Sequence, residues 1–135
     1  MTTANIKNVQ VNTTHTLFVC TTCATVWQGG KPIGESGGIK LLQHLQDLAE
    51  CWELRNHFAI KQVACMSACN RSCVVAFAAE GKSTYVFGDL PVDGSRAILD
   101  CASQYYTKED GSLPWSERPE LLKKGLLAKV PSIGK

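Results

Sequence analysis

The chain has 135 residues, of which 44% are hydrophobic and 19% are charged, and its formal net charge is +2. This composition is typical of one globular domain with a core of its own, and it excludes the disordered and fibrous classes. The basic residues are scattered with few aromatic residues among them, so nucleic acid is not an expected partner.

The N-terminal residues show no apolar segment behind a basic region, and no apolar run is long enough to cross a bilayer. We therefore expect a cytoplasmic protein without a membrane partner. The chain has 7 cysteines. In a reducing compartment, cysteines that lie close together bind metals or carry out redox chemistry more often than they form structural disulfides.

The first half of the chain predicts a strand, a helix and a second strand. Residues 1–12 are polar and predict a loose N-terminal arm, and the apolar run Thr16–Val19 predicts a buried strand that ends at Cys20. Glycines between positions 29 and 38 predict a loop. Apolar residues then recur at helical spacing, and Phe58–Val63 alternates as a strand does. The predicted helix carries Ile39, Leu42, Leu45, Ala49 and Trp52.

The second half predicts a hairpin and a helix. Val74–Ala78 and Thr84–Phe87 flank a short glycine-containing turn, so we expect two antiparallel neighbours. Asp89 is the predicted N-cap of a following helix. One face of that helix carries Ile98, Cys101, Ala102 and Tyr105. Residues 108–135 are rich in proline, with a short helix expected around 121–127, and predict a C-terminal extension packed on a domain that spans 13–107.

The predicted order is βαβ followed by ββα. A right-handed βαβ unit with a following ββα unit is the thioredoxin topology. We therefore expect an α/β, thioredoxin-like fold, in which flanking helices pack against a four-stranded mixed sheet.

Two cysteine groups carry the chemistry that the sequence predicts. Cys20 and Cys23 form a C-x2-C pair at the end of the first strand, and Cys65, Cys69 and Cys73 follow the second. A short spacer lets one loop turn two sulfurs toward the same ion, and two such loops complete four-coordination. The spacing therefore predicts a metal or iron–sulfur site.

The other cysteines and the histidines are weaker candidates. Cys51 and Cys101 each lie on a predicted helix without a second cysteine at chelating spacing, so we expect both to be small buried residues. His15, His44 and His57 are scattered, and a lone histidine is usually a surface or satisfied core group. Only His15 lies near the first strand.

Several segments resemble known families. Cys65–Cys69 followed by Val74-Val75, together with the strand Leu17–Cys20, resembles the thioredoxin-like [2Fe-2S] ferredoxins and the related subunit of respiratory NADH dehydrogenases. The whole chain resembles, nearly end to end, a bacterial family of predicted metal-binding proteins of unknown function, DUF1636. The segments that carry this second resemblance are Val19–Cys23, Cys65–Cys73, Val75–Phe77, Thr84–Leu90 and Pro114–Pro119.

The resemblance to the ferredoxins implies a ligand set. Cys20 matches the first ligand, and Cys65 and Cys69 match the third and fourth. Cys23 is the candidate for the second, although it follows Cys20 by only three positions, whereas the ferredoxins place this ligand in a longer loop. Cys73 lies where thioredoxin-like folds often place a proline, and it is either an alternate ligand or a small buried residue.

Three functions are consistent with these thiols. The first is a non-enzymatic one-electron carrier with a [2Fe-2S] cluster, a redox protein as its partner, and a homodimer that the resemblance implies through the sheet side. The second is a zinc-binding or metal-handling protein that uses the same thiols. The third is a dithiol oxidoreductase that uses Cys20 and Cys23, although the glycine-rich stretch 24–38 predicts no helix to activate a thiol. Arg71 would moderate the charge of a cluster or be an ordinary exposed side chain.

Overall fold

The computed structural model describes residues 14–21, 27–32, 34, 36–64, 71 and 73–133. Within these residues the predicted strands and helices occur in the predicted order, with two short strands added between the first strand and the first helix, and two 3-10 turns and a strand added after residue 107. The strands are β1 (His15–Cys20), β2 (Trp27–Gln28), β3 (Lys31–Pro32), β4 (Phe58–Val63), β5 (Val75–Ala79), β6 (Thr84–Phe87) and β7 (Leu126–Val130). The helices are α2 (Gly37–Ala49) and α3 (Ser95–Thr107), with 3-10 turns η2 (Trp115–Glu117) and η3 (Glu120–Leu122).

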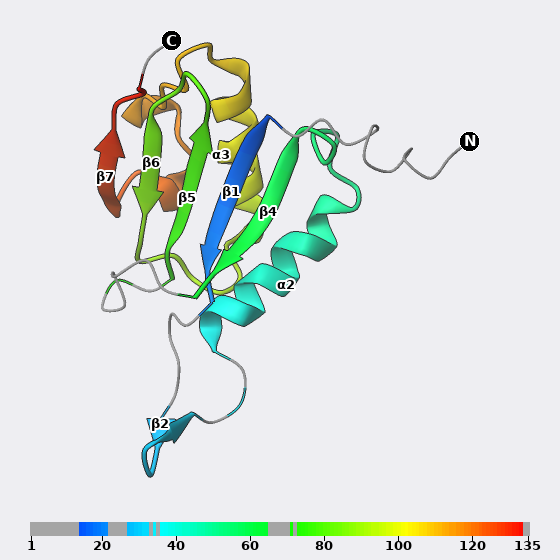
Figure 1. Cartoon of the computed structure of the whole chain (residues 1–135), viewed down its shortest axis with the longest axis vertical. Helices are drawn as coiled ribbons and strands as arrows, with labels where there is room; N and C mark the ends of the chain where they lie inside the picture. The colour runs from blue at the N-terminus through cyan, green and yellow to red at the C-terminus, as the bar shows by residue number, and fades with distance from the viewer. Residues whose placement is uncertain are drawn as a thin grey trace, which may run out of the picture.

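The main sheet has the order β4-β1-β5-β6-β7 (Figure 1). Strand β4 runs parallel to β1, whereas β5, β6 and β7 are joined to their neighbours by antiparallel pairing. The expected α/β fold with a mixed sheet is therefore confirmed, including the βαβ unit and the hairpin. The sheet has five strands rather than the expected four.

The fifth strand corrects the expectation for the C-terminal segment. Where a helix is expected around 121–127, the chain instead forms the 3-10 turn Glu120–Leu122 and then crosses Gly125, at φ 84°, into β7. Strand β6 would otherwise present unpaired backbone groups at the sheet edge, and β7 satisfies them. The division of the chain at residue 107 stays a prediction.

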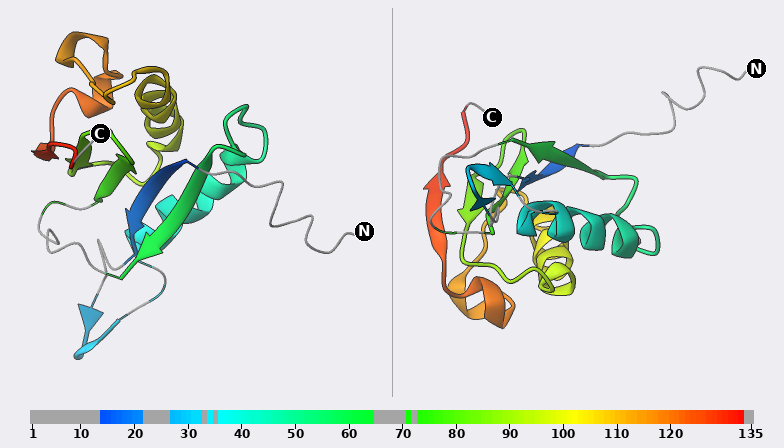
Figure 2. Two further views of the ribbon diagram at one scale, coloured as in Figure 1. Left: turned by 45° about the horizontal axis from the view of Figure 1, so that its top comes forward. Right: turned by 90° about the horizontal axis from the view of Figure 1, so that it is seen from below.

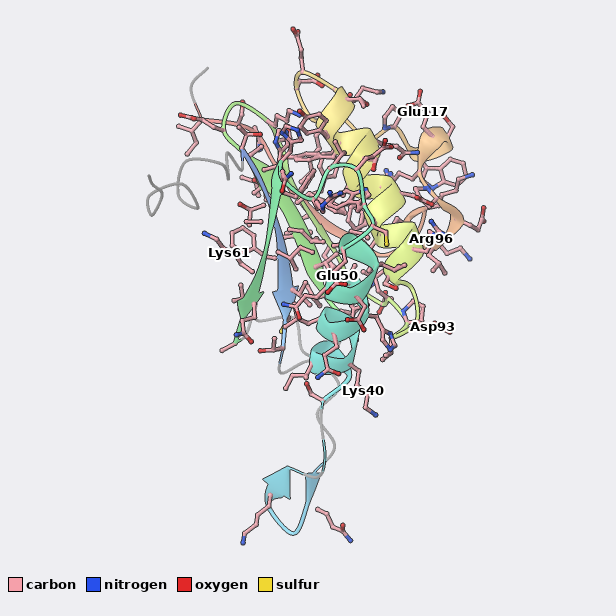
Figure 3. The ribbon with its side chains drawn as sticks, turned by 90° about the vertical axis from the view of Figure 1, so that its right-hand side faces the viewer. Lys40, Glu50, Lys61, Asp93, Arg96 and Glu117 are labelled. Carbon is pink, nitrogen blue, oxygen red and sulfur yellow. The ribbon has the colours of Figure 1, made fainter. Side chains whose placement is uncertain are left out.

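Helices α2 and α3 lie on the same side of the main sheet (Figure 2). Strand β1 shows why: Leu17 and Val19 are fully buried, while Thr16 and Phe18 between them are partly exposed. Lys61 on β4 points away from the helices, on the other side of the sheet (Figure 3). The core thus forms between the helices and one face of the sheet.

A small hairpin of β2 and β3 lies apart from the main sheet (Figure 1). Gly29 and Gly30 form its turn with φ values of 60° and 80°, a left-handed conformation that favours glycine. The sequence predicted the turn here but not the two short strands.

Two local expectations are wrong. Helix α3 begins at Ser95 with Gly94 as its N-cap and no capping side chain, so Asp89 does not cap it. Cys51 is exposed, because α2 ends at Ala49 and the helical spacing that buries Ala49 does not continue into the turn beyond it. In contrast, Cys101 is fully buried, as expected.

Among the described residues, no helix combines the length and the apolar character needed to cross a membrane.

Candidate metal centre

Two of the five clustered thiols, Cys20 and Cys73, belong to the part of the chain that the structure describes, and both are buried. Cys23, Cys65 and Cys69 lie outside the described residues. The described part of the candidate site therefore consists of Cys20, Cys73 and the strands β1, β4 and β5 next to the two cysteine groups.

Cys20 is the last residue of β1 and is 1% exposed. Its backbone N–H donates to the Val74 carbonyl at 3.0 Å, and its register partner on β4 is Val63. Its Sγ lies 4.0 Å from the carbonyl oxygen of Ala64, the residue before Cys65. Cys20 thus sits between the end of β4 and the start of β5, where the chain enters and leaves the second cysteine group.

The first turn of α2 packs directly against the end of β1. A Cβ on Gly38 would lie 2.0 Å from the carbonyl oxygen of Cys20, so only glycine fits there without movement. The Ser36 hydroxyl accepts the Ile39 N–H at 3.1 Å as a helix N-cap and donates to the Thr21 carbonyl. These contacts fix the backbone of residues 20 and 21. Gly38 therefore belongs to the helix rather than to the loop that the sequence predicted.

Cys73 is held by a backbone pair with Leu90. Its N–H donates to the Leu90 carbonyl at 3.0 Å, and its carbonyl accepts the Leu90 N–H at 3.2 Å. Cys73 is 2% exposed, and Val74 beside it is fully buried. The position of this thiol is therefore set by the chain that follows β6.

Arg71 and Asp89, which lie close in sequence to Cys73 and Leu90, form a second connection between these two parts of the chain. The Arg71 Nε lies 3.0 Å from Asp89 Oδ1, and the Asp89 N–H donates to the Arg71 carbonyl at 2.6 Å. Asp89 has a φ of 58°, and a Cβ on Gly88 would lie 2.7 Å from the Arg71 carbonyl oxygen. Arg71 lowers the pKa of the Asp89 carboxyl through this hydrogen bond. The structure thus makes Arg71, two residues before Cys73 in the chain, an ion-pair partner of Asp89.

Sequence reasoning missed this pairing because it gave Asp89 to the helix that follows. The available signal was the run Gly88-Asp89-Leu90, in which glycine and aspartate are typical of a tight turn.

The two described thiols share one apolar environment. Burial raises the pKa of the Cys73 thiol, and the neighbouring Cys20 raises it further. Cysteine binds metals as the thiolate, so a cation between such thiols would offset both effects. Sulfur donors suit iron–sulfur clusters and zinc. The chemistry of the donors therefore fits either group, although the described residues alone contain no cluster of three or more potential metal ligands.

His15 lies at the opposite end of β1 from Cys20 and has another role. Its Nε2 lies 2.7 Å from the Nζ of Lys82, which also donates to the carbonyls of Tyr105 and Tyr106 at 2.9 and 3.0 Å. Burial, followed by the charges of Lys82 and His57, lowers the pKa of His15 to about 4. His15 is thus a neutral hydrogen-bond acceptor in a network at the end of α3, remote from the described thiols.

Comparison with known proteins agrees with this fold. The model of the DUF1636 family, described as a protein of unknown function, matches residues 17–132. No curated protein sequence matches the chain.

Solved structures of a thioredoxin-like [2Fe-2S] ferredoxin from Aquifex aeolicus are similar to this structure. One has 16% sequence identity and a TM-score of 0.55, with 87% of this chain and 94% of that chain covered. A cysteine-to-serine variant of the same ferredoxin has 14% identity and a TM-score of 0.53, with coverage of 84% and 98%. At this identity the likeness establishes the thioredoxin-like fold and does not by itself establish a shared ligand.

Proposed function

The chain belongs to the DUF1636 family, and we propose that it is a ferredoxin-like one-electron carrier whose thiols bind a [2Fe-2S] cluster. The observation that carries the proposal is the pair of buried thiols, Cys20 and Cys73, at the sheet end where the second cysteine group leaves β4 and joins β5. The likeness of the fold to a [2Fe-2S] ferredoxin supports it.

Cys20, Cys65 and Cys69 are proposed as three ligands, and the resemblance to the ferredoxins adds Cys23 as the fourth. When bound, such a cluster supplies a one-electron couple. The role of the chain is to hold the thiolates and to limit the access of water, which together with hydrogen bonds to sulfur sets the reduction potential. The fixed backbone at the end of β1 suits this role, because a rigid ligand changes little between two oxidation states.

We further propose that the protein is not an enzyme and that it works in the cytoplasm with a redox protein as its partner. The formal net charge of +2 favours an acidic partner surface, because complementary charge speeds docking. A homodimer that pairs through the sheet side is proposed from the resemblance to the ferredoxins.

The test is purification without oxygen, followed by measurement of iron, acid-labile sulfide, visible absorption and the electron paramagnetic resonance of the reduced protein. We expect a reddish-brown protein with equal iron and sulfide. Serine variants at Cys20, Cys65 and Cys69 should each lose the wild-type spectrum. Cys51→Ser is the matched control, because Cys51 is exposed and lies beyond the end of α2. A colourless protein with stoichiometric zinc and no sulfide would disprove electron transfer through a cluster.

The dithiol alternative has its own test. If Cys20 and Cys23 act as a redox pair, the purified protein should reduce insulin disulfides and lose that activity in Cys20→Ser. Under the carrier proposal we expect no such activity in either protein.

A further inference from the structure

A cavity of about 400 Å³ lies between the end of α2 and one side of α3. We propose that it binds a free α-amino acid with a large apolar side chain. The inference is independent of the proposed metal site, because the residues that line the cavity lie between 48 and 53 and between 96 and 103. The volume of the cavity is within the range of pockets that hold small molecules in proteins.

The inner surface of the cavity is apolar. Leu99 on α3 is 4% exposed, Leu48 near the end of α2 is partly buried, and the side chain of Trp52 also lines the cavity. An aromatic or branched apolar group bound here would remove this surface, and its own, from water. The cavity therefore favours a ligand with an apolar side chain.

The position of Trp52 is already fixed. Its Nε1 donates to the Ser103 hydroxyl at 3.1 Å, and this hydroxyl donates to the Leu99 carbonyl at 3.1 Å. The Trp52 ring also lies 5.1 Å from the ring of Phe58. A side chain that is ordered before the ligand arrives loses less conformational entropy on binding. Because the indole N–H is bonded within the protein, Trp52 offers a ligand an apolar ring surface.

The rim of the cavity carries charges of both signs. Arg96 and Asp100 are exposed and lie four residues apart on α3, so they are neighbours on one face of the helix. Glu53, in the turn after α2, adds a second exposed carboxylate. The ion pairs found among the described residues involve other side chains. A guanidinium and a carboxylate thus lie next to each other at the rim without forming an ion pair.

Charges of both signs beside an apolar surface fit a zwitterion. Arginine binds a carboxylate through two parallel hydrogen bonds, and the carboxylates of Asp100 and Glu53 accept from an ammonium group. An α-amino acid carries its carboxylate and its ammonium on one carbon, so neighbouring side chains of opposite sign can bind both. Its side chain is then free to contact the apolar inner surface. A simple amine or a simple carboxylic acid would leave Arg96 or the two carboxylates without a partner.

The probe is L-phenylalanine, titrated into the purified wild-type protein by isothermal calorimetry. Phenethylamine lacks its carboxylate and hydrocinnamate lacks its ammonium, so the two analogues test each charged group separately. Cys51 reports the location of binding, because its thiol is exposed and lines the cavity. We expect L-phenylalanine to slow the alkylation of Cys51 by iodoacetamide, measured by mass spectrometry of the Cys51 peptide.

The variants are Arg96→Gln and Asp100→Asn. Their matched controls are Lys40→Gln and Asp93→Asn, which make the same charge changes at exposed positions outside the cavity (Figure 3). Each site variant should weaken L-phenylalanine binding by about tenfold, because each removes a hydrogen bond between charged groups. Phenethylamine should bind Arg96→Gln as it binds the wild type, since this analogue lacks the group that Arg96 holds. Hydrocinnamate should bind Asp100→Asn as it binds the wild type, for the corresponding reason.

Several outcomes would overturn the inference. These are no binding of L-phenylalanine at millimolar concentration, equal affinity of the wild type for L-phenylalanine and phenethylamine, and equal affinity of the site variants and their controls. Unchanged alkylation of Cys51 would place the binding elsewhere on the protein and would overturn it as well. None of these measurements requires iron or sulfide, so this inference and the proposed electron carrier can each fail without the other.

Discussion

Gly38 occupies a position on α2 that faces the backbone of the first proposed ligand. A Cβ there would lie 2.0 Å from the Cys20 carbonyl oxygen and 3.0 Å from backbone atoms of Thr21. The obstacle is backbone rather than a flexible side chain, so relief requires the helix or the strand to move.

Gly38→Ala should therefore lower the free energy of unfolding by about 1–3 kcal/mol, the range typical of overpacking. Urea unfolding of the metal-free protein measures this change. The matched control is Gln46→Ala, on the exposed side of the same helix, which should change the free energy by less than about 0.5 kcal/mol. Equal stability of Gly38→Ala and wild type would show that the contact is not maintained in solution.

At the scale of elements, Lys82 connects the β5–β6 turn with β1 and α3. Its ammonium donates to the last carbonyls of α3 and to His15 Nε2, and it lies over the rings of Tyr105 and Tyr106. A cation at a helix C-terminus is favourable, and here it also satisfies carbonyls that have no partner within the helix. The network requires His15 to be neutral, so that Nε2 can accept.

The pH dependence of stability follows from His15. Its pKa falls from 6.5 to about 4 on folding, so between these values the unfolded chain binds the additional proton. Stability should be greatest above about pH 6.5 and should fall by about 3 kcal/mol as the pH is lowered to 4. Thermal unfolding at a series of pH values measures this.

His15→Gln is the control for this prediction, because glutamine can accept from Lys82 but does not titrate. Its stability should change less with pH than that of the wild type between pH 4 and 6.5. If stability falls equally with pH in both proteins, a titratable group other than His15 causes the effect.

Elements with a clear apolar pattern could be predicted from the sequence, and others could not. Strand β1 follows from an apolar run, β4 follows from an alternating pattern, and the hairpin follows from two apolar runs around Gly81. Strand β7 could not be predicted, because its residues are exposed or partly exposed and show no alternation. Its pairing depends on the free edge of β6, which is a property of the assembled sheet.

The candidate site could be predicted as a set of thiols but not as an arrangement. Spacing draws attention to Cys20 and Cys73, whereas the contact of Cys73 with Leu90 joins residues that no local pattern relates. Cys51 was expected to be buried on the helix but lies two residues beyond its end, and periodicity alone does not fix where a helix ends.

At the scale of the whole molecule, the C-terminal segment is part of the core. Leu113 and Leu122 are buried, and Arg118 lies over the ring of Phe87 and donates to the carbonyls of both leucines. These contacts hold the segment that precedes β7 against the sheet.

A chain that ends at Thr107 should therefore unfold or aggregate. Each leucine contributes about 1.5–3 kcal/mol by burial, and their loss removes much of the 5–15 kcal/mol typical of a domain. Circular dichroism and size-exclusion chromatography of the truncated chain measure this outcome. The control ends at Pro131 and retains β7, so it should behave as the wild type. A stable, monomeric 1–107 chain would instead support the domain boundary that the sequence predicts.

The connections of the sheet also determine when the metal centre can form during synthesis. Cys20 and Ala64 meet although they are 44 residues apart in sequence, and Cys73 is positioned by Leu90, which the ribosome adds later. All five clustered thiols thus emerge from the ribosome before strand β6 and Leu90, which would hold Cys73 in place. We therefore expect a nascent chain to expose reactive thiols before the metal site can form. Metal loading should follow the emergence of β6 from the ribosome rather than that of the cysteines.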